Sequence, residues 1–241
     1  MSCRILSVDW DFFFPIPYDT PEEMMYDWGH RETPFFSCGI IWDLRAASFT
    51  CTGRPLPLCQ RWERFAQRFK FSPGAQVFLA EHHVMAIQLV AGKLLPSDVT
   101  EIVSYDAHHD CGYGPVPDTG EIVTTTDEEG RVQVDSENWL GIAIKHYGIR
   151  AEVVYPDWKD GRKIEGAPQI EPADWSNDKG LADWHHFDAV LLCRSGVWVP
   201  PWCDEQWALF TDTWPKDMER VYLESEAGKM RDTGVMLADA V

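Results

Sequence analysis

This sequence has few positively charged residues relative to its negatively charged ones. Its 241 residues include 21 lysines and arginines against 39 aspartates and glutamates, which gives a formal net charge of −18 at pH 7. A chain with this balance repels nucleic acid and anionic lipid, and it attracts cationic ligands. We therefore expect no nucleic-acid partner and no membrane partner, although an acidic surface also serves simple solubility.

Paired cysteines and long apolar runs are also missing. The seven cysteines include no CxxC pair, which excludes a zinc ribbon and a thioredoxin-like motif. No run approaches the ~20 apolar residues of a membrane span. Asp9 stands where a signal peptide requires an apolar stretch. We expect a reduced, cytoplasmic protein.

Short apolar runs alternate with helical patterns along the chain. This alternation is typical of an α/β domain with a mostly parallel sheet, and we expect one three-layer domain spanning residues 1–241. Irregular loops with at most one short helix are expected at 18–58, and a loop or small hairpin at 111–135. The strand-like runs lie at 5–8, 76–80, 99–105, 151–155 and 187–193, and the helical patterns at 58–71, 84–90, 136–148 and from 204 onward.

The apolar run that begins near Ile102 ends in three potential metal ligands. Asp106, His108 and Asp110 occupy alternate positions, and side chains at i, i+2 and i+4 of an extended segment share one face. They should converge beyond the carboxyl end of a strand, where parallel α/β sheets bind their ligands. Carboxylates with an imidazole suit a divalent cation such as Mn²⁺ or Zn²⁺. The alternative is a solvated charge cluster.

The first apolar run leads into two carboxylates. Asp9 and Asp11 share a face and stand among aromatic residues. Burying both is costly unless a cation neutralises them. The pair is therefore either a second set of metal ligands or a solvated loop start.

The run at 76–80 leads into Glu81, His82 and His83. Adjacent histidines at a strand-to-helix junction cannot both face one point. One of them can ligate a metal while the other packs or forms a hydrogen bond, and a purely structural pair remains the alternative.

Four aspartates with histidine suit two metal ions better than one. Two divalent ions about 3.5–4 Å apart can clamp a developing tetrahedral centre. The reaction class is then hydrolysis of a C–N bond or of a phosphoester. The candidate metal ligands are Asp9, Asp11, His82, His83, Asp106, His108 and Asp110.

Three of these elements resemble signatures of the arginase/ureohydrolase superfamily. Residues 106–110 (DAHHD) resemble its DAHxD signature, and residues 7–11 (SVDWD) resemble its SxDxD signature. Residues 81–83 (EHH) are similar to its Gly-Gly-Asp-His element, in which the ligand directly follows a carboxylate, and this favours His82. The resemblance implies an arginase-like fold and two Mn²⁺ ions per chain. Because SxDxD comes first here and last in arginases, it also implies a permuted order of elements.

A fourth segment departs from the family pattern. Residues 138–141 (NWLG) are similar to the Asn-x-His-Gly proton-shuttle segment, with Leu140 where the histidine belongs. Asp110, His109 and Asn138 are the catalytic candidates that the resemblance implies. His146 or water are further substitutes for the shuttle.

With its late CRSGVWVPP stretch at 193–201, the sequence is similar to the peptide arginases of ribosomal peptide natural-product (RiPP) pathways. The likeness implies a Mn²⁺-dependent hydrolase that converts arginine side chains within a peptide to ornithine and releases urea. Candidate substrate contacts are Glu81, Glu205 and Trp139. Two alternatives stay open: a hydrolase of a small guanidine or amide, and a non-catalytic metal-binding protein.

Overall fold

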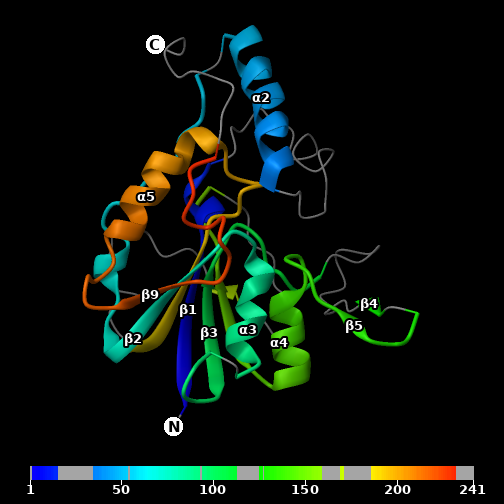
Figure 1. The fold of residues 1–241 in the computed structure, drawn as a ribbon, viewed down its shortest axis with the longest axis vertical. Coiled ribbons are helices and arrows are strands. Elements are labelled where there is room, and N and C mark those ends of the chain that lie inside the picture. Colours follow the sequence, from blue (N-terminus) through cyan, green and yellow to red (C-terminus); the bar gives the residue numbers. More distant parts are fainter. Residues whose placement is uncertain are drawn as a thin grey trace.

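A seven-stranded sheet organises the chain, and all of its pairings are parallel (Figure 1). Its strand order is β7-β6-β3-β1-β8-β2-β9. The computed structural model describes residues 2–15, 35–53, 55–92, 94–112, 125–126, 128–158, 169–170 and 186–231. The strands are β1 (Cys3–Asp9), β2 (Phe71–Ala80), β3 (Val99–Tyr105), β6 (Arg150–Val154), β7 (Gln169–Ile170), β8 (Phe187–Cys193) and β9 (Glu219–Tyr222).

The expected α/β class with a mostly parallel sheet is confirmed. Strands β8, β2 and β9 lie on one side of β1, and β3, β6 and β7 lie on the other. Parallel sheets bind ligands outside the carboxyl ends of their strands, at the point where the strand order reverses. In this sheet that point lies beside β1. The helices and 3₁₀ turns are η1 (Trp10–Phe13), α2 (Phe35–Cys51), η2 (Ala66–Arg68), η3 (His83–Met85), α3 (Ala86–Val90), α4 (Trp139–Tyr147), η5 (Pro201–Cys203) and α5 (Asp204–Asp212).

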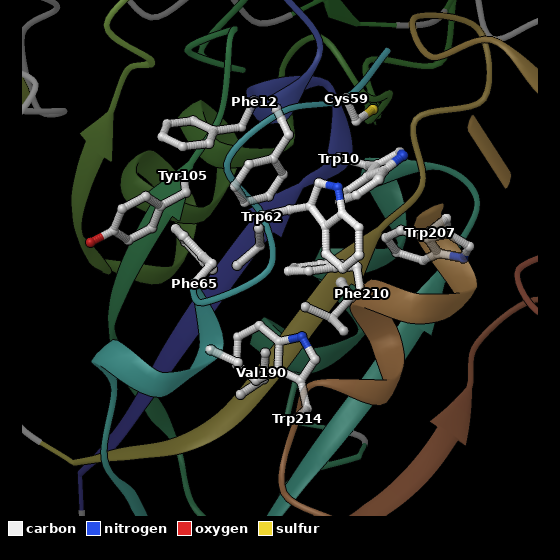
Figure 2. Close-up of a cluster of buried hydrophobic side chains, with 14 of the residues drawn as sticks. Trp10, Phe12, Cys59, Trp62, Phe65, Tyr105, Val190, Trp207, Phe210 and Trp214 are labelled. Carbon is white, nitrogen blue, oxygen red and sulfur yellow. The ribbon is translucent and has the colours of Figure 1, made fainter. Parts of the chain in front are cut away.

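One face of the sheet is packed with aromatic rings (Figure 2). The ring of Trp10 stacks on Phe210 of α5, with centroids 4.9 Å apart, and lies edge-on to Trp207 at 5.6 Å. Large buried rings contribute strongly to a hydrophobic core. Because Trp10 stands between Asp9 and Asp11, this packing fixes the turn that carries both carboxylates.

Helices α3 and α4 cover the opposite face. Leu89 of α3 and Leu140 of α4 belong to a core with Phe78, Ile102 and Leu191 of the sheet. Helix α4 ends at Gly148, whose φ of 68° lies in the left-handed region that glycine adopts without steric cost. The first turn of α4 rests near the carboxyl edge of the sheet, and its last turn rests near the opposite edge (Figure 1).

The helix expected at 58–71 is wrong. The segment contains one short 3₁₀ turn, η2, and Arg61 interrupts it with a left-handed backbone at φ 63°. Trp62 and Phe65 are nevertheless buried in the aromatic core. The helix-like spacing of these rings therefore reflects the tertiary burial of an irregular segment.

Of three other segments, two differ from expectation and one agrees with it. Residues 35–51 form α2, a longer helix than the short one expected within 18–58, and residues 16–34 lie outside the described part. The expected hairpin within 111–135 is present as β4 (Thr125–Thr126) paired with β5 (Val132–Gln133). Strand β9 falls in a stretch whose sequence signals are weak.

Every helix in the described ranges falls short of the length and apolar character that crossing a bilayer demands. The six cysteines that the structure describes are free thiols.

Candidate metal centre

Candidate metal ligands from three strand exits meet at the carboxyl edge of the sheet. Asp9, His83 and Asp106 form one group of potential metal ligands, and Asp11, Asp106 and His108 form another. Within each group the ligand atoms lie within 4.8 Å of one another. Asp106 belongs to both groups, so the two candidate sites are adjacent.

Nδ1 of His83 is surrounded by three carboxylates. It lies 3.1 Å from Oδ2 of Asp9, 3.1 Å from Oδ2 of Asp106 and 2.9 Å from Oδ2 of Asp110. A ring nitrogen carries at most one hydrogen, so it cannot serve three acceptors well. Two ligands bound at right angles about 2.1 Å from one ion are themselves about 3.0 Å apart. Each of the three distances from Nδ1 therefore matches the spacing of two neighbouring ligands, and Asp9, His83 and Asp106 also lie close enough to one another to share one cation.

His108 organises the second group. Its Nδ1 lies 2.8 Å from Oδ2 of Asp11 and 3.7 Å from Oδ1 of Asp106. Asp106 thus presents Oδ2 to His83 and Oδ1 to His108. A carboxylate that faces two donor sets in this way is suited to bridge two ions.

Neighbouring groups orient the first set. Oγ of Ser7 lies 2.8 Å from Nε2 of His83, and a proton donated from Nε2 to Ser7 leaves the Nδ1 lone pair for a metal. The indole N–H of Trp139 donates to Oδ2 of Asp110 at 2.7 Å. Asp110 has a left-handed backbone at φ 47°, and its carbonyl accepts hydrogen bonds from the N–H groups of Leu140 and Gly141 in α4. The loop is therefore held rigidly where Asp110 meets His83.

Burial of like charges shifts the pKa values of the cluster. Burial, then the charges of Asp11 and Asp106, raises the pKa of Asp9 to about 7. Burial, then the charges of Asp110 and Asp11, raises the pKa of Asp106 to about 7. Burial lowers the pKa of His83, but hydrogen bonds to Asp106, Asp110 and Asp9 outweigh it and hold that pKa well above its ordinary value. A proton on His83 therefore compensates part of the negative charge, and a divalent cation suits the same position.

His83, rather than His82, reaches the carboxylates. His82 keeps the extended backbone of the strand exit and turns to Glu224, with Nδ1 2.8 Å from Oε1. The 3₁₀ turn η3 begins at His83 and directs that ring to the cluster. The order of carboxylate and histidine favoured His82, but the histidine that joins the candidate metal group is His83.

The two expected guanidinium partners are a buried, paired carboxylate and an exposed one. Glu81 is buried, and its Oε2 accepts a 2.6 Å hydrogen bond from Nε of the buried Arg194. The carboxylate of Glu81 is therefore already paired with an arginine of the chain itself. Glu205 is exposed in the first turn of α5.

The segment likened to a proton shuttle serves the fold. Oδ1 of Asn138 accepts a hydrogen bond from the backbone N–H of Asp135 at 3.0 Å. Trp139 is fully buried against the ring of His83, with centroids 4.7 Å apart, so its observed contact is with a candidate metal ligand. Leu140 packs in the core beneath α4. The position where the resemblance places a histidine is therefore a core position.

The two substitute histidines lie in different surroundings. His109 is buried, and its Nδ1 accepts a 3.0 Å hydrogen bond from the backbone N–H of Cys111. His146 is exposed in the last turn of α4, at the opposite end of that helix from Asp110. A shuttle at either position remains a prediction.

Sequence reasoning missed three supporting groups. Ser7 shares a strand face with Asp9, so strand alternation was an available signal. Glu224 contacts His82 across 142 residues. The ring of Trp198 lies 4.7 Å from that of His108. Local sequence patterns carry no information about the last two contacts.

Comparison with protein-family models, curated proteins and solved structures finds no match to this chain. Fold and geometry define its class as a parallel α/β protein whose buried aspartates and histidines can hold a metal ion.

Proposed function

We propose that the chain is a binuclear metal-dependent C–N hydrolase of the arginase-like type, which converts arginine side chains within a peptide to ornithine and releases urea. The observation that carries the proposal is the carboxylate of Asp106, which faces His83 with one oxygen and His108 with the other. Two ligand sets that share one carboxylate support a two-ion site, and the resemblance to arginase signatures supports Mn²⁺ as the ion.

The chain's own residues divide the work. His83, Asp9, Asp110 and Asp106 would hold one ion, and His108 and Asp11 would hold the other together with Asp106. Bound divalent ions supply Lewis acidity and a water of lowered pKa. Ser7 fixes the ring of His83, and Trp139 fixes the carboxylate of Asp110.

Asp110 is the carboxylate that would hydrogen-bond the attacking water, as the resemblance to arginases implies. The indole of Trp139 holds its Oδ2 in place. The same packing keeps bulk water from most of the cluster, because Asp9, Asp11, Asp106 and Asp110 are all buried.

Charge and partial burial on one side of the cluster support the proposed substrate class. His108 and Trp198 are only partly buried, unlike the four aspartates. A substrate would therefore approach on the side of His108 and Trp198. The net charge of −18 favours a cationic side chain. Since Arg194 engages Glu81, that carboxylate is not the guanidinium partner.

One observation favours a non-catalytic metal-binding protein. The core position of Leu140 leaves the proton-shuttle segment without the histidine that the resemblance places there. Such a protein would bind the same two ions but turn over no substrate.

Urea release separates these functions. The protein loaded with Mn²⁺ is given a peptide with one internal arginine and both ends blocked, and in parallel free arginine. We expect the blocked peptide to show the higher kcat/KM, because binding energy from the peptide outside the arginine is used in the transition state. His108→Ala should lose the activity, and His186→Ala, which changes an exposed histidine, should keep it. Faster turnover of free arginine would indicate an ordinary ureohydrolase, and two bound ions without turnover would indicate the non-catalytic protein.

A further inference from the structure

The segment after β9, residues 223–231, runs back along the carboxyl ends of the strands, where Figure 1 draws it in red. Its first contact is the hydrogen bond from the N–H of Leu223 to the carbonyl of Leu79, 2.9 Å long, near the end of β2. From there it touches elements on both flanks of the metal centre. We call residues 223–231 the strap.

Glu224 is the anchor of the strap on the His83 side. Its Oε2 accepts hydrogen bonds from the backbone N–H groups of Glu81 at 2.8 Å and His82 at 2.9 Å. Its Oε1 lies 2.8 Å from Nδ1 of His82. One carboxylate thus fixes two successive peptide units immediately before His83. The direction in which the His83 ring leaves the chain depends on those two units.

Arg231 is the anchor on the His108 side. Its Nη1 donates to the carbonyls of Gly196 at 2.7 Å and Val199 at 2.8 Å, and its backbone N–H donates to Asp204 at 2.7 Å. These carbonyls belong to loop 194–199. The loop carries Trp198, whose ring lies against that of His108.

Arg194 joins the two anchors. Its Nη2 donates to the carbonyl of Glu226 at 2.8 Å, its Nη1 donates to the carbonyl of Lys229, and its Nε donates to Glu81. Arg194 is only 1% exposed. A buried guanidinium that serves the strap, the β2 exit and the β8 exit makes these three parts a connected unit.

We propose that the strap positions both histidines of the metal centre. Glu224 fixes the orientation of His83. Arg231 fixes the orientation of His108 through loop 194–199 and Trp198. The proposal goes beyond the hydrolase function, because it concerns metal binding and holds for any substrate. Groups that orient metal ligands without touching the ion typically change metal affinity about 10–100-fold when removed.

The Glu224 half is tested by titrating the metal-free protein with Mn²⁺ and recording the electron paramagnetic resonance spectrum. Glu224→Ala should bind one of its two ions at least about tenfold more weakly and show the signal of isolated Mn²⁺. The matched control is Glu226→Ala, which removes another strap carboxylate that pairs with Ser225 and Lys229 at the surface. It should bind both ions as the wild type does.

A purely structural role for the strap would lower the melting temperature of Glu224→Ala and leave the affinity of the folded protein for Mn²⁺ unchanged, which would overturn this half of the proposal. Should Glu224→Ala not fold, Glu224→Asp asks the same question, because the shorter carboxylate cannot hold both peptide units in place. Glu224→Gln should largely restore binding, since its amide oxygen still accepts the two backbone hydrogen bonds.

The Arg231 half is tested by replacing Trp198. Arg231 itself is not replaced, because its loss would leave the buried carboxylate of Asp204 without this partner. Trp198→Ala should weaken the ion at His108 about tenfold or more, and Trp198→Phe should retain most of the affinity because a ring still rests on His108. If Trp198→Ala binds both ions with wild-type affinity, loop 194–199 does not position His108 and this half of the proposal fails.

Discussion

The indole of Trp139 donates a 2.7 Å hydrogen bond to the same oxygen of Asp110 that lies 2.9 Å from His83. The first residue of α4 therefore controls a carboxylate that ends the loop after β3. Because the carbonyl of Asp110 is also held by the first turn of α4, helix and loop together fix the position of this candidate ligand.

Trp139→Phe should weaken metal binding while the fold survives. Phenylalanine keeps a buried ring but loses the hydrogen bond that orients Asp110, and loss of such a contact typically reduces metal affinity about 10–100-fold. The control is Trp214→Phe. Trp214 is equally buried, and among the described residues its indole N–H has no hydrogen-bond partner. Mn²⁺ titration should show weaker binding in the first variant and unchanged binding in the second. Equal affinities would remove Trp139 from the metal centre.

The adjacent histidines should behave differently when replaced. His83→Ala should lose at least one of two bound ions, because Nδ1 of His83 stands among three carboxylates. His82→Ala should keep both ions, since Glu224 still accepts the backbone N–H groups of Glu81 and His82. Metal content after dialysis distinguishes the two variants. Loss of metal from His82→Ala alone would show that the ligand is His82.

Much of the candidate site was predictable from sequence because it depends on local geometry. Asp9 with Asp11, and Asp106 with His108 and Asp110, follow from alternation at strand ends, and a parallel sheet gathers its strand ends at one edge. The α/β class followed from the same alternation of elements.

The parts of the site that the sequence did not predict depend on tertiary contacts or on the residue at which a turn begins. The choice between His82 and His83 is set by where η3 begins. Glu81 looked available for a substrate because Arg194 lies 113 residues away in sequence. The rings of Trp62 and Phe65 showed helical spacing, although an irregular segment buries them.

Gly196→Ala should destabilise the fold strongly. A Cβ at this position would lie 2.0 Å from Oε1 of Glu81, and that side chain cannot yield easily because it is buried and paired with Arg194. Breaking a buried ion pair costs about 3–5 kcal/mol. Gly130→Ala is the control, since its Cβ meets nothing within 4 Å and its left-handed backbone adds about 1–2 kcal/mol of strain. Urea denaturation should rank the variants in this order. A loss at Gly196 no larger than at Gly130 would show that Glu81 moves freely.

Acid should weaken the contribution of Glu101 to stability. Burial raises the pKa of Glu101, but hydrogen bonds from Arg150 and Arg4 outweigh it and hold that pKa below its ordinary value. A carboxyl with a lowered folded-state pKa stabilises the fold above its unfolded pKa of about 4.3, and this stabilisation is lost as pH falls further. Wild type should therefore exceed Glu101→Gln in unfolding free energy at neutral pH, with the difference shrinking toward about pH 3. A difference that is constant with pH would contradict the role of the ion pairs.

The central claim is that Asp106 joins two metal sites. Its most direct test counts Mn²⁺ ions per chain by equilibrium dialysis and elemental analysis, for the wild type, Asp106→Ala and the control Asp188→Ala. Asp188 lies in β8 and bonds to Arg4 and Ser72. We predict two ions in the wild type and in the control, and none held tightly by a folded Asp106→Ala protein. A wild type that binds no Mn²⁺ or one ion, or an Asp106→Ala protein that still binds two, would contradict the account.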